Sequence, residues 1–529
     1  MLTCKVSDLL ASDIQCLDAI KPLKNRIPGE CHVYFVGIKG TGVCPLAELM
    51  HKAGYRVSGS DIPEEFYTDK ILKKLNIPFF ENFDAVHISG DISLVIHSAA
   101  YSAGTNCELA KALELDIPVL KYTDALGAWS SMFDSTGICG VHGKTTTTAM
   151  CGVLAKAAGL PAQILVGSAV LDFDEMSTFS MAHASSDERS GGSGLTDKYF
   201  IAETCEYRKH FLSFHPKRII LTSVESDHQD FFPTYESIRD AFVEYCGLLP
   251  EGGQLFYCAD DAGAREVAAI IEKNNQNKKI DIISYGFNAS GDYKINSAYI
   301  ENARTVFSLA YNPSIYGDED SVFKLSIPGR HEVLNAAAAL ALTIELAKNE
   351  KMAANEKLFS GGQLRSIKNA IENFKSAKRR SEIIGEADGI IFMDDYGHHP
   401  TAIKTTLEGI KSFYPGRRLI VSFMSHTYTR TASLLEEFAG AFNDAEIVFF
   451  HKIYASAREN YKGGVNGKTL FERASSVRKG ETYYVDEYED AFGTLCEILK
   501  SGDIFLTLGA GNNWPLGVKL YNYKRGYHD

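Results

Sequence analysis

Short apolar runs alternate with amphipathic stretches along most of the chain. The pattern is clearest in residues 32–61, where an apolar run ends in "GIKGTG", an amphipathic stretch closes at Gly54, and a second apolar run ends at Asp61. This order predicts a strand, a tight turn, a helix and a second strand. We expect further strands at similar apolar runs: "ISLVIHSAA", "IPVLKY", "KYFIAETCE", "KRIILTSVES", "GGQLFYCADD", "GIIFMDDYGHHP", "RRLIVSFMSH", "AEIVFFHKIY" and "DIFLTLGAG". Strands that alternate with helices are typical of an α/β fold built on mostly parallel sheets.

A chain of 529 residues is too long for one hydrophobic core, so we expect several domains. The pattern divides it into an N-terminal extension (residues 1–30), a first unit (31–132), a second unit (133–376) and a third unit (377–529). The second unit contains an alanine-rich stretch, "NAAAALALTIELAKN", that predicts a long helix. Its segment 183–198 is rich in serine, glycine and charged residues, which predicts a mobile surface loop.

Composition narrows the class of protein further. The net charge of −13 argues against bulk nucleic-acid binding, so no nucleic-acid partner is expected. The eleven cysteines are scattered and form no C-x-x-C pair, which favours reduced thiols in a cytoplasmic protein. No apolar stretch reaches the roughly 18 residues that cross a bilayer, so we expect no membrane insertion.

The stretch "GICGVHGKTTTT", residues 137–148, resembles a phosphate-binding loop. Glycines at a strand-to-helix turn let backbone N–H groups approach phosphates, while Lys144 could reach the β- and γ-phosphates and Thr145 could bind Mg²⁺. The Walker A pattern also requires a glycine five residues before Gly143, and Ile138 stands there instead. An ordinary strand-turn-helix remains the alternative.

Two acidic clusters follow strand-like runs in the second unit. Glu203 and Glu206 lie in "AETCEYRKHF", and Asp227, His228 and Asp230 lie in "SVESDHQDFF". Taken singly, each residue is more often a helix cap or a surface group. Carboxylates and a histidine at strand ends behind a phosphate loop favour a site for Mg²⁺ and ATP.

The turn "GIKGTG" has the spacing G-x-x-G-x-G rather than the dinucleotide-binding spacing G-x-G-x-x-G. Asp61 lies at the end of the second predicted strand, where an acidic residue could meet a ribose hydroxyl. These two features support a nicotinamide-dependent oxidoreductase as an alternative function. A tight turn with a purely structural role is the other interpretation of this stretch.

The third unit carries two polar stretches at strand ends, "DDYGHHP" and "FMSHTYTRT". His398 and His399 are adjacent, and adjacent residues of a strand point to opposite faces, so they make a poor metal pair. A substrate-binding loop is the better interpretation. Arg430 could grip a carboxylate through two hydrogen bonds. In "IPGRHEVLNAAAA", Asn335 could bond an adenine edge, or it could cap a helix.

These motifs in this order resemble the Mur ligase superfamily, the ATP-dependent amide-forming enzymes of peptidoglycan precursor synthesis. The series runs from about residue 32 to 511: "GIKGTG", "GVHGKTTTT", "ETCEYRKHF", "ESDHQD", "PGRHEVLNA", "RR", "DDYGHHPTAI" and "HTYTRT". The phosphate loop of the family also lacks the early Walker glycine. The resemblance implies three domains: a Rossmann-like N-terminal domain that binds a UDP-sugar, a central P-loop domain that binds ATP, and a Rossmann-like C-terminal domain that binds an amino acid.

The resemblance also implies roles for particular residues, with ATP and Mg²⁺ as cofactors. The implied catalytic residues are Lys144, Glu203, His228 and Arg380. The implied ATP-binding residues are Gly140, His142, Gly143, Lys144, Thr145, Thr146, Asn335, Arg379 and Asp395. The implied UDP-sugar-binding residues are Gly37, Gly40, Gly42, Asp61 and Ser98. The implied amino-acid-binding residues are Tyr396, His398 and Arg430, and the implied metal-binding residues are Thr145, Glu203 and His228.

Within the superfamily the sequence is most similar to the members that join L-alanine to UDP-N-acetylmuramate, so these are the expected small-molecule partners. The relatives that recycle murein tripeptide are the alternative within the family, and a non-catalytic nucleotide-binding regulator is a further one. A monomer or a homodimer is expected. The sequence departs from the family pattern at Glu332, Thr427 and Asn512, which stand where the family usually has asparagine, arginine and aspartate.

Overall fold

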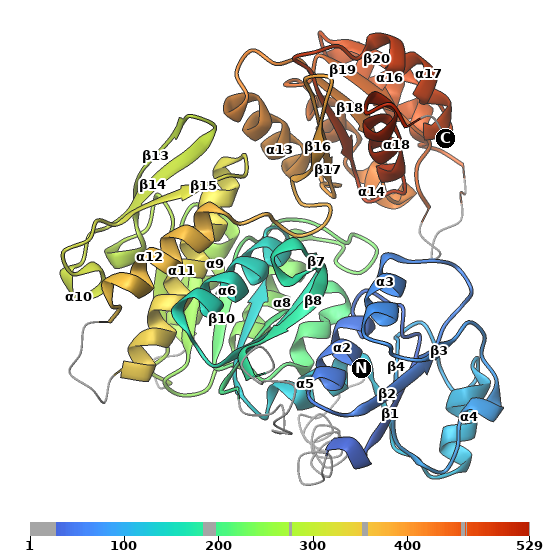
Figure 1. The fold of residues 1–529 in the computed structure, drawn as a ribbon, viewed down its shortest axis with the longest axis vertical. Helices are drawn as coiled ribbons and strands as arrows, with labels where there is room; N and C mark the ends of the chain where they lie inside the picture. Colours follow the sequence, from blue (N-terminus) through green and yellow to red (C-terminus); the bar gives the residue numbers. More distant parts are fainter. Residues whose placement is uncertain are drawn as a thin grey trace.

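Three β-sheet units follow one another along the chain in the structure, a computed structural model (Figure 1). It describes residues 28–182, 197–274, 278–351, 358–455, 461 and 463–527. The predicted loop 183–198 therefore lies almost wholly outside the described residues, as does most of the predicted extension 1–30. Figure 1 shows the C-terminal unit, in orange and red, above the N-terminal unit in blue and the central unit in green.

The N-terminal sheet has five parallel strands in the order β3-β2-β1-β4-β5. Its strands are β1 (His32–Val36), β2 (Arg56–Ser60), β3 (Phe79–Phe80), β4 (Ile92–His97) and β5 (Val119–Lys121). The helices that follow them are α2 (Val43–Lys52), α3 (Tyr67–Lys74), α4 (Cys107–Glu114) and α5 (Tyr122–Ser130), with short 3₁₀ turns at η1 (Pro28–Glu30) and η2 (Ala85–His87). The chain order reverses between β1 and β4, and ligands of open α/β sheets bind at such a switch point.

The central sheet has seven strands in the order β12-β11-β10-β6-β9-β7-β8, all parallel except β8, which is antiparallel to β7. Its strands are β6 (Asp134–Cys139), β7 (Ala162–Val170), β8 (Met176–Ser180), β9 (Tyr199–Glu203), β10 (Arg218–Leu221), β11 (Gln254–Cys258) and β12 (Asp281–Tyr285). The connecting helices are α6 (Lys144–Ala158), η3 (Leu171–Phe173), η4 (Tyr207–Ser213), α8 (Tyr235–Cys246), α9 (Ala262–Asn274) and η5 (Gly291–Tyr293). The switch point lies at β6, so the phosphate-loop motif begins where a ligand site is expected.

A smaller antiparallel sheet follows in the order β13-β14-β15, and it was not expected from the sequence. Its elements are β13 (Ile295–Glu301), β14 (Arg304–Leu309), α10 (Pro313–Tyr316) and β15 (Val322–Leu325), followed by α11 (Arg330–Lys351) and α12 (Gly361–Glu372). Helix α11 contains the alanine-rich stretch and packs along α6. Its small side chains are almost all buried, which lets the two helices approach closely.

The C-terminal sheet has six strands in the order β16-β17-β21-β18-β19-β20, with β16 antiparallel to β17 and the others parallel. Its strands are β16 (Glu382–Ala387), β17 (Ile390–Asp395), β18 (Leu419–Phe423), β19 (Ile447–Phe450), β20 (Glu481–Tyr484) and β21 (Ile504–Leu508). Its helices are α13 (Pro400–Phe413), α14 (Tyr428–Ser433), α15 (Leu435–Gly440), α16 (Gly467–Val477), η6 (Tyr488–Ala491), α17 (Phe492–Ile498) and α18 (Trp514–Lys524). The α/β class and the strands that were predicted from apolar runs are confirmed.

The N-terminal and central units share one continuous hydrophobic core, whereas the C-terminal sheet has separate cores on its two faces. A buried carboxylate reinforces the first contact. Glu48 of α2 accepts hydrogen bonds from the backbone N–H groups of Ser177 and Thr178 in β8, each at 3.0 Å, and pairs with Lys52 at 2.6 Å. These bonds attach the N-terminal unit firmly to the central sheet.

Every cysteine among the described residues is a free thiol, as the scattered cysteine pattern predicted. In the same part of the chain, no helix combines the length and the apolar composition that crossing a bilayer requires.

Candidate active site between the central and C-terminal units

A cavity of about 550 Å³ lies where the carboxyl ends of the central strands face the C-terminal sheet. Both units line it. The predicted site residues on its wall are His142, Gly143, Lys144, Thr145, Thr146, His228, Asn335, Arg380, Asp395, Tyr396, His398 and Arg430. Gly140, Glu203 and Arg379 do not line this cavity, although each contacts a residue that does. One space therefore gathers most of the residues that the sequence assigned to ATP, metal and amino acid.

The phosphate-loop motif forms a tight turn between β6 and α6. Ile138, at the position of the missing Walker glycine, is a fully buried residue of β6 and pairs with strands on both sides. The turn itself needs glycine at two places. Gly140 has a φ of +135°, and a Cβ there would lie 2.1 Å from Thr222 Oγ1; Gly143 has a φ of +80°, and a Cβ there would lie 2.6 Å from Asn335 Oδ1. The position at which the Walker pattern expects a glycine therefore lies in the strand rather than in the turn.

Lys144 begins α6 and folds back over the loop. Its Nζ donates to the carbonyl oxygen of Gly140 and lies 2.9 Å from a carboxylate oxygen of Glu206. Burial lowers the pKa of Lys144, but the Glu206 carboxylate outweighs it and the net pKa is raised, so the ammonium stays charged. Burial likewise raises the pKa of Glu206, and Lys144 and His228 outweigh it, so the carboxylate stays ionised. His228 Nε2 lies 3.4 Å from Glu206.

Thr145 and Glu203 form the second polar pair of the site. The Thr145 hydroxyl donates to Glu203 Oε1 at 3.1 Å, and the N–H of Gly167 donates to Oε2 at 3.0 Å. Of the three predicted metal-binding residues, the structure thus brings Thr145 and Glu203 together, whereas His228 contacts Glu206. A hydroxyl and a carboxylate supply the hard oxygen atoms that Mg²⁺ prefers, so this pair fits that ion.

Two adjacent arginines in the connection to the C-terminal sheet point in different directions. Arg380 reaches the central unit, where its Nη2 lies 3.4 Å from Thr145 Oγ1. Arg379 stays within the C-terminal unit: its Nε donates to Asp394 at 3.0 Å and its Nη2 donates to the carbonyl oxygen of Gly509 at 2.7 Å. Of the two side chains, it is that of Arg380 that crosses to the central unit.

Asn335, near the start of α11, connects that helix to the phosphate loop. Its Oδ1 accepts from Thr147 Oγ1 at 3.2 Å, and its Nδ2 donates to Glu332 at 2.9 Å. Glu332 replaces the asparagine that is usual in the family, and it also lies 3.4 Å from His331. Burial lowers the pKa of His331, and Glu332 more than compensates, so the net pKa is raised.

The C-terminal residues predicted to bind an amino acid meet the central unit directly. Arg430 is buried, and its Nε and Nη2 both donate to Oδ1 of Asp227, at 3.0 and 2.8 Å. Burial raises the pKa of Asp227, but the guanidinium outweighs it and holds the pKa well below its usual range. His398 turns toward Tyr396 and His426, and burial holds its pKa well below the usual value, so it is neutral.

Asp395, which was also assigned to ATP, ends β17, and the departures Thr427 and Asn512 lie in loops of the C-terminal unit. Asp395 accepts from the N–H groups of Ser381 and Gly397, each at 2.7 Å, which shapes the turn after β17. Thr427 adopts a positive φ of 65° before α14. Asn512 follows the turn after β21.

The predicted UDP-sugar residues gather at the carboxyl ends of β1, β2 and β4. Gly37 has a φ of +82°, and a Cβ there would lie 2.9 Å from Ser98 Cβ, so only glycine fits the turn. A Cβ on Gly42 would touch the Tyr122 ring at 3.0 Å. Asp61 is buried and accepts from the N–H of Lys39 in the turn at 2.7 Å, so its carboxylate supports the glycine turn. Gly40 lies in the same turn, where its N–H donates to Gly37 at 3.1 Å.

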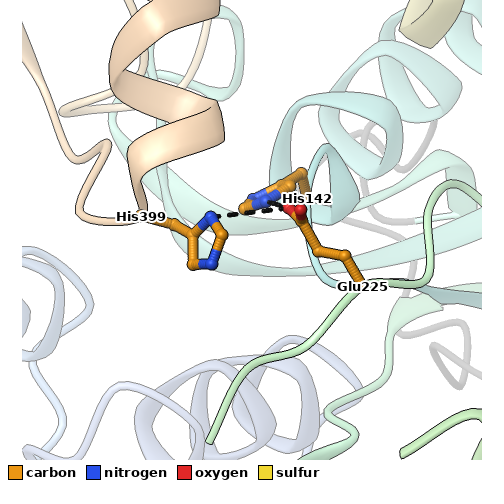
Figure 2. A group of neighbouring side chains, drawn as sticks. All are labelled: His142, Glu225 and His399. Carbon is orange, nitrogen blue, oxygen red and sulfur yellow. Dashed lines mark hydrogen bonds and ion pairs between the residues drawn. The ribbon is translucent and has the colours of Figure 1, made fainter. Parts of the chain in front are cut away.

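Sequence reasoning missed a second group of side chains between the units. His142 of the phosphate loop, Glu225 of the segment after β10, and His399 at the start of α13 converge on one point (Figure 2). A ligand atom from each lies within 4.8 Å of the others. No local signal connects residues that are so far apart in sequence, and Glu225 and His399 meet only because the C-terminal unit packs against the central one.

Comparison with known proteins matches each unit to a described domain. Residues 32–134 match the Mur ligase family, catalytic domain; residues 138–343 match the Mur ligase middle domain; and residues 379–511 match the Mur ligase, glutamate ligase domain. The chain is 46% identical over 491 residues to a UDP-N-acetylmuramate–L-alanine ligase of Treponema pallidum, covering 93% of this chain and 96% of the relative. It is 38% identical to the enzyme of the same name from Borrelia garinii, over 92% of this chain and 97% of that relative.

Solved structures show the same fold. A UDP-N-acetylmuramate–alanine ligase of Thermotoga maritima superposes with a TM-score of 0.71 and 22% identity, covering 94% of this chain and all of that one. A murein peptide ligase of Psychrobacter arcticus superposes with a TM-score of 0.61 and 21% identity, covering 93% of this chain and 98% of that one. A MurF ligase of Thermotoga maritima in complex with ADP superposes with a TM-score of 0.54 and 15% identity, covering 88% of this chain and 94% of that one. Neither the oxidoreductase nor the regulator alternative is favoured by these matches, and the chain belongs to the Mur ligase family.

Proposed function

We propose that this chain is an ATP-dependent ligase that joins L-alanine to the carboxylate of UDP-N-acetylmuramate, with release of ADP and phosphate. The observation that carries the proposal is the single cavity in which the phosphate loop of the central unit faces Arg380 and Arg430 of the C-terminal unit. The choice of substrates rests on the names of relatives that are 35–46% identical to this chain over more than nine-tenths of its length.

ATP is placed at the phosphate loop. The loop N–H groups and the charged Lys144 ammonium would hold its phosphates, with His142, Gly143 and Thr146 beside them. Gly140 and Gly143 support this placement, because a side chain at either would collide with Thr222 or Asn335 and distort the turn. Mg²⁺ held by Thr145 and Glu203 would neutralise charge on the phosphates. Asn335 is proposed to face the adenine, and Asp395 to shape the phosphate side from the C-terminal unit.

The reaction is proposed to take place in two steps. An oxygen of the muramate carboxylate attacks the γ-phosphorus of ATP, which breaks the bond to ADP and forms an acyl phosphate. The amine of L-alanine then attacks the acyl carbon, phosphate leaves, and the amine loses a proton as the amide forms. Lys144 and Arg380 would stabilise the negative charge of the transferred phosphoryl group. His228, beside Glu206, is proposed to contact the reacting carboxylate or a second metal ion.

The amino acid is placed between Arg430, His398 and Tyr396. Arg430 offers two parallel N–H donors, the geometry that a carboxylate accepts best. In the structure both donors engage Oδ1 of Asp227, so this side chain already holds one carboxylate at the boundary between the two units. The neutral His398 adds no positive charge of its own beside Arg430.

The UDP-sugar is placed at the glycine turn of the N-terminal unit, with Gly37, Gly40 and Gly42 giving close approach to its diphosphate and Ser98 and Asp61 supporting the turn. The division into an extension (1–30), a UDP-sugar domain (31–132), an ATP domain (133–376) and an amino-acid domain (377–529) is proposed on the same basis. The separate N-terminal, central and C-terminal sheets and the three matched domains support it.

The proposal is tested by measuring phosphate release from ATP while each substrate is left out in turn. Release that requires both UDP-N-acetylmuramate and L-alanine is the expected result. Release that requires murein tripeptide in place of L-alanine would assign the chain to the recycling ligases instead. Release that is independent of either substrate would refute the ligase proposal.

A further inference from the structure

The group His142, Glu225 and His399 is more than a polar contact between two units. Oε1 of Glu225 accepts from His142 Nε2 and lies 3.5 Å from Nδ1 of His399 (Figure 2). The second carboxylate oxygen, Oε2, accepts from Thr401 Oγ1 at 3.0 Å, which orients the carboxylate from the side of the C-terminal unit. Two residues of the group come from the central unit and one from the C-terminal unit.

The hydrogen bonds leave this group with an electrostatic conflict. Nδ1 of His399 accepts from the N–H of Thr401, so it carries no hydrogen, yet it faces the Glu225 carboxylate, which is also an acceptor. His399 is only 6% exposed, and its Nε2 is buried without a hydrogen-bond partner. Two unprotonated acceptors in contact repel each other unless a cation lies between them.

The chemistry and spacing of these side chains suit a metal cation. Imidazole nitrogens and a carboxylate oxygen are ligands that transition metals take in proteins, and the three ligand atoms lie within 4.8 Å of one another.

We propose that His142, Glu225 and His399 form a binding site for a transition-metal ion of the Zn²⁺ type, which joins the C-terminal unit to the phosphate loop. Two histidines and one glutamate, with a fourth position left open, form a set that Zn²⁺ occupies in other proteins. Nitrogen ligands disfavour Mg²⁺, so the site is chemically distinct from the Thr145–Glu203 pair. Ligand atoms about 2.0–2.2 Å from a tetrahedral Zn²⁺ lie roughly 3.4 Å from one another, so binding would require His142 and Glu225 to move slightly apart to admit the ion.

The position of the site predicts its effect. His142 directly precedes Gly143 and Lys144, and His399 directly precedes α13. An ion that binds both histidines would hold the phosphate loop against the start of α13 and oppose separation of the two units. Bound Zn²⁺ should therefore stabilise the folded chain, because it binds an arrangement that only the folded state has.

The test is a titration of the full-length, untagged protein with Zn²⁺ alone, in competition with a chromophoric zinc chelator and with millimolar Mg²⁺ present. His399→Asn removes the imidazole but keeps a side chain that can cap α13, and Glu225→Gln keeps the shape of the carboxylate without its charge. His32→Asn is the matched control, since His32 also lies beside a carboxylate, at 3.3 Å from Asp91, but belongs to no group of three among the residues that the structure describes.

We expect the number of tightly bound Zn²⁺ ions per chain to be one higher in the wild type and in His32→Asn than in either site variant. Affinity for that ion should fall by roughly 100-fold or more in the site variants. Mutating even a residue that only hydrogen-bonds to a metal ligand lowers metal affinity by about 10–100-fold. Zn²⁺ should also raise the midpoint of thermal unfolding in the wild type and the control but not in the site variants. Co²⁺ added in place of Zn²⁺ should give the visible absorption of a tetrahedral site only when all three residues are present.

Equal zinc stoichiometry and affinity in the wild type and the two site variants would overturn the proposal, and would leave the group as a hydrogen-bonded contact between units. Displacement of the ion by millimolar Mg²⁺ would also overturn it. The circular dichroism of each variant without metal shows whether it is folded, and a variant that fails to fold is replaced by His399→Gln. None of these measurements uses ATP or the sugar substrate, so their outcome is independent of the ligase proposal.

Discussion

Replacing Arg380 by alanine is expected to slow the chemical step without unfolding the protein. Arg380 is the residue of the arginine pair that extends into the central unit, where its Nη2 lies 3.4 Å from the Thr145 hydroxyl. That hydroxyl in turn contacts Glu203 at 3.1 Å. The guanidinium therefore lies beside the place where the transferred phosphoryl group is proposed to be.

The size of the effect follows from the charge that is lost. A unit charge about 5 Å from another, at an effective dielectric constant of about 20, interacts with an energy of about 3 kcal/mol. A loss of about 3 kcal/mol of transition-state stabilisation slows kcat roughly a hundredfold, which agrees with the 10²–10³-fold cost of removing one donor from an oxyanion site. The KM for ATP should change much less, because the charge develops mainly in the transition state.

Arg379→Ala is the matched control, since the two arginines are adjacent but differ in their contacts. Arg379 pairs with the buried Asp394, whose pKa burial raises to about 6 in spite of the arginine. Loss of Arg379 should destabilise the C-terminal unit by no more than about 3 kcal/mol, because Asp394 can escape an unpaired buried charge by taking up a proton. Arg379→Ala should therefore lower the unfolding midpoint clearly, while its kcat stays much closer to that of the wild type than the kcat of Arg380→Ala does.

The assay is steady-state phosphate release with all three substrates, together with thermal unfolding of both variants. A kcat for Arg380→Ala within about threefold of the wild type would refute the assignment of Arg380. An equal loss of kcat in Arg379→Ala, with an unchanged unfolding midpoint, would refute the division of roles between the two arginines.

Three further predictions concern other parts of the site and the fold. Lys144→Ala should abolish ATP-dependent turnover while UDP-sugar binding, followed by calorimetry, persists; near-normal turnover would contradict the phosphate-loop assignment. Arg430→Ala should mainly raise the KM for L-alanine, and a change confined to ATP affinity would show that the amino-acid site lies elsewhere. Burial lowers the pKa of His451 from 6.5 to about 4, so between these values the unfolded chain binds the proton and the folded chain does not. Folding stability should consequently fall by up to about 3 kcal/mol as the pH drops from 6.5 to 4, and His451→Gln should flatten that slope in urea unfolding.

Local pattern was sufficient to predict the elements that hold the site. The strands around "GICGVHGKTTTT" and "GIIFMDDYGHHP" were predictable because buried parallel strands read as short apolar runs that end in glycine or polar residues. The α/β class followed from their alternation with helices. The sheet β13-β14-β15 was not predicted, since its strands are partly exposed and carry residues such as Tyr299 and Val322 on the solvent side.

Contacts between units could not be read from the sequence. Arg430 was recognised as a residue suited to a carboxylate, but its partner Asp227 lies 203 positions away and meets it only after the C-terminal unit has packed against the central one. The same holds for Glu225 and His399. Their separate strands and turns were predictable, whereas their convergence depends on the orientation of two units, which no local spacing encodes.

The most direct test of the ligase mechanism follows the oxygen atoms of the sugar carboxylate. UDP-N-acetylmuramate labelled with ¹⁸O in that carboxylate would be incubated with the protein, ATP, Mg²⁺ and L-alanine, and the phosphate and the product would be analysed by mass spectrometry. We predict that each released phosphate contains one ¹⁸O atom and that the amide product keeps the other. Unlabelled phosphate, or a product without alanine, would contradict the proposed ligation through an acyl phosphate.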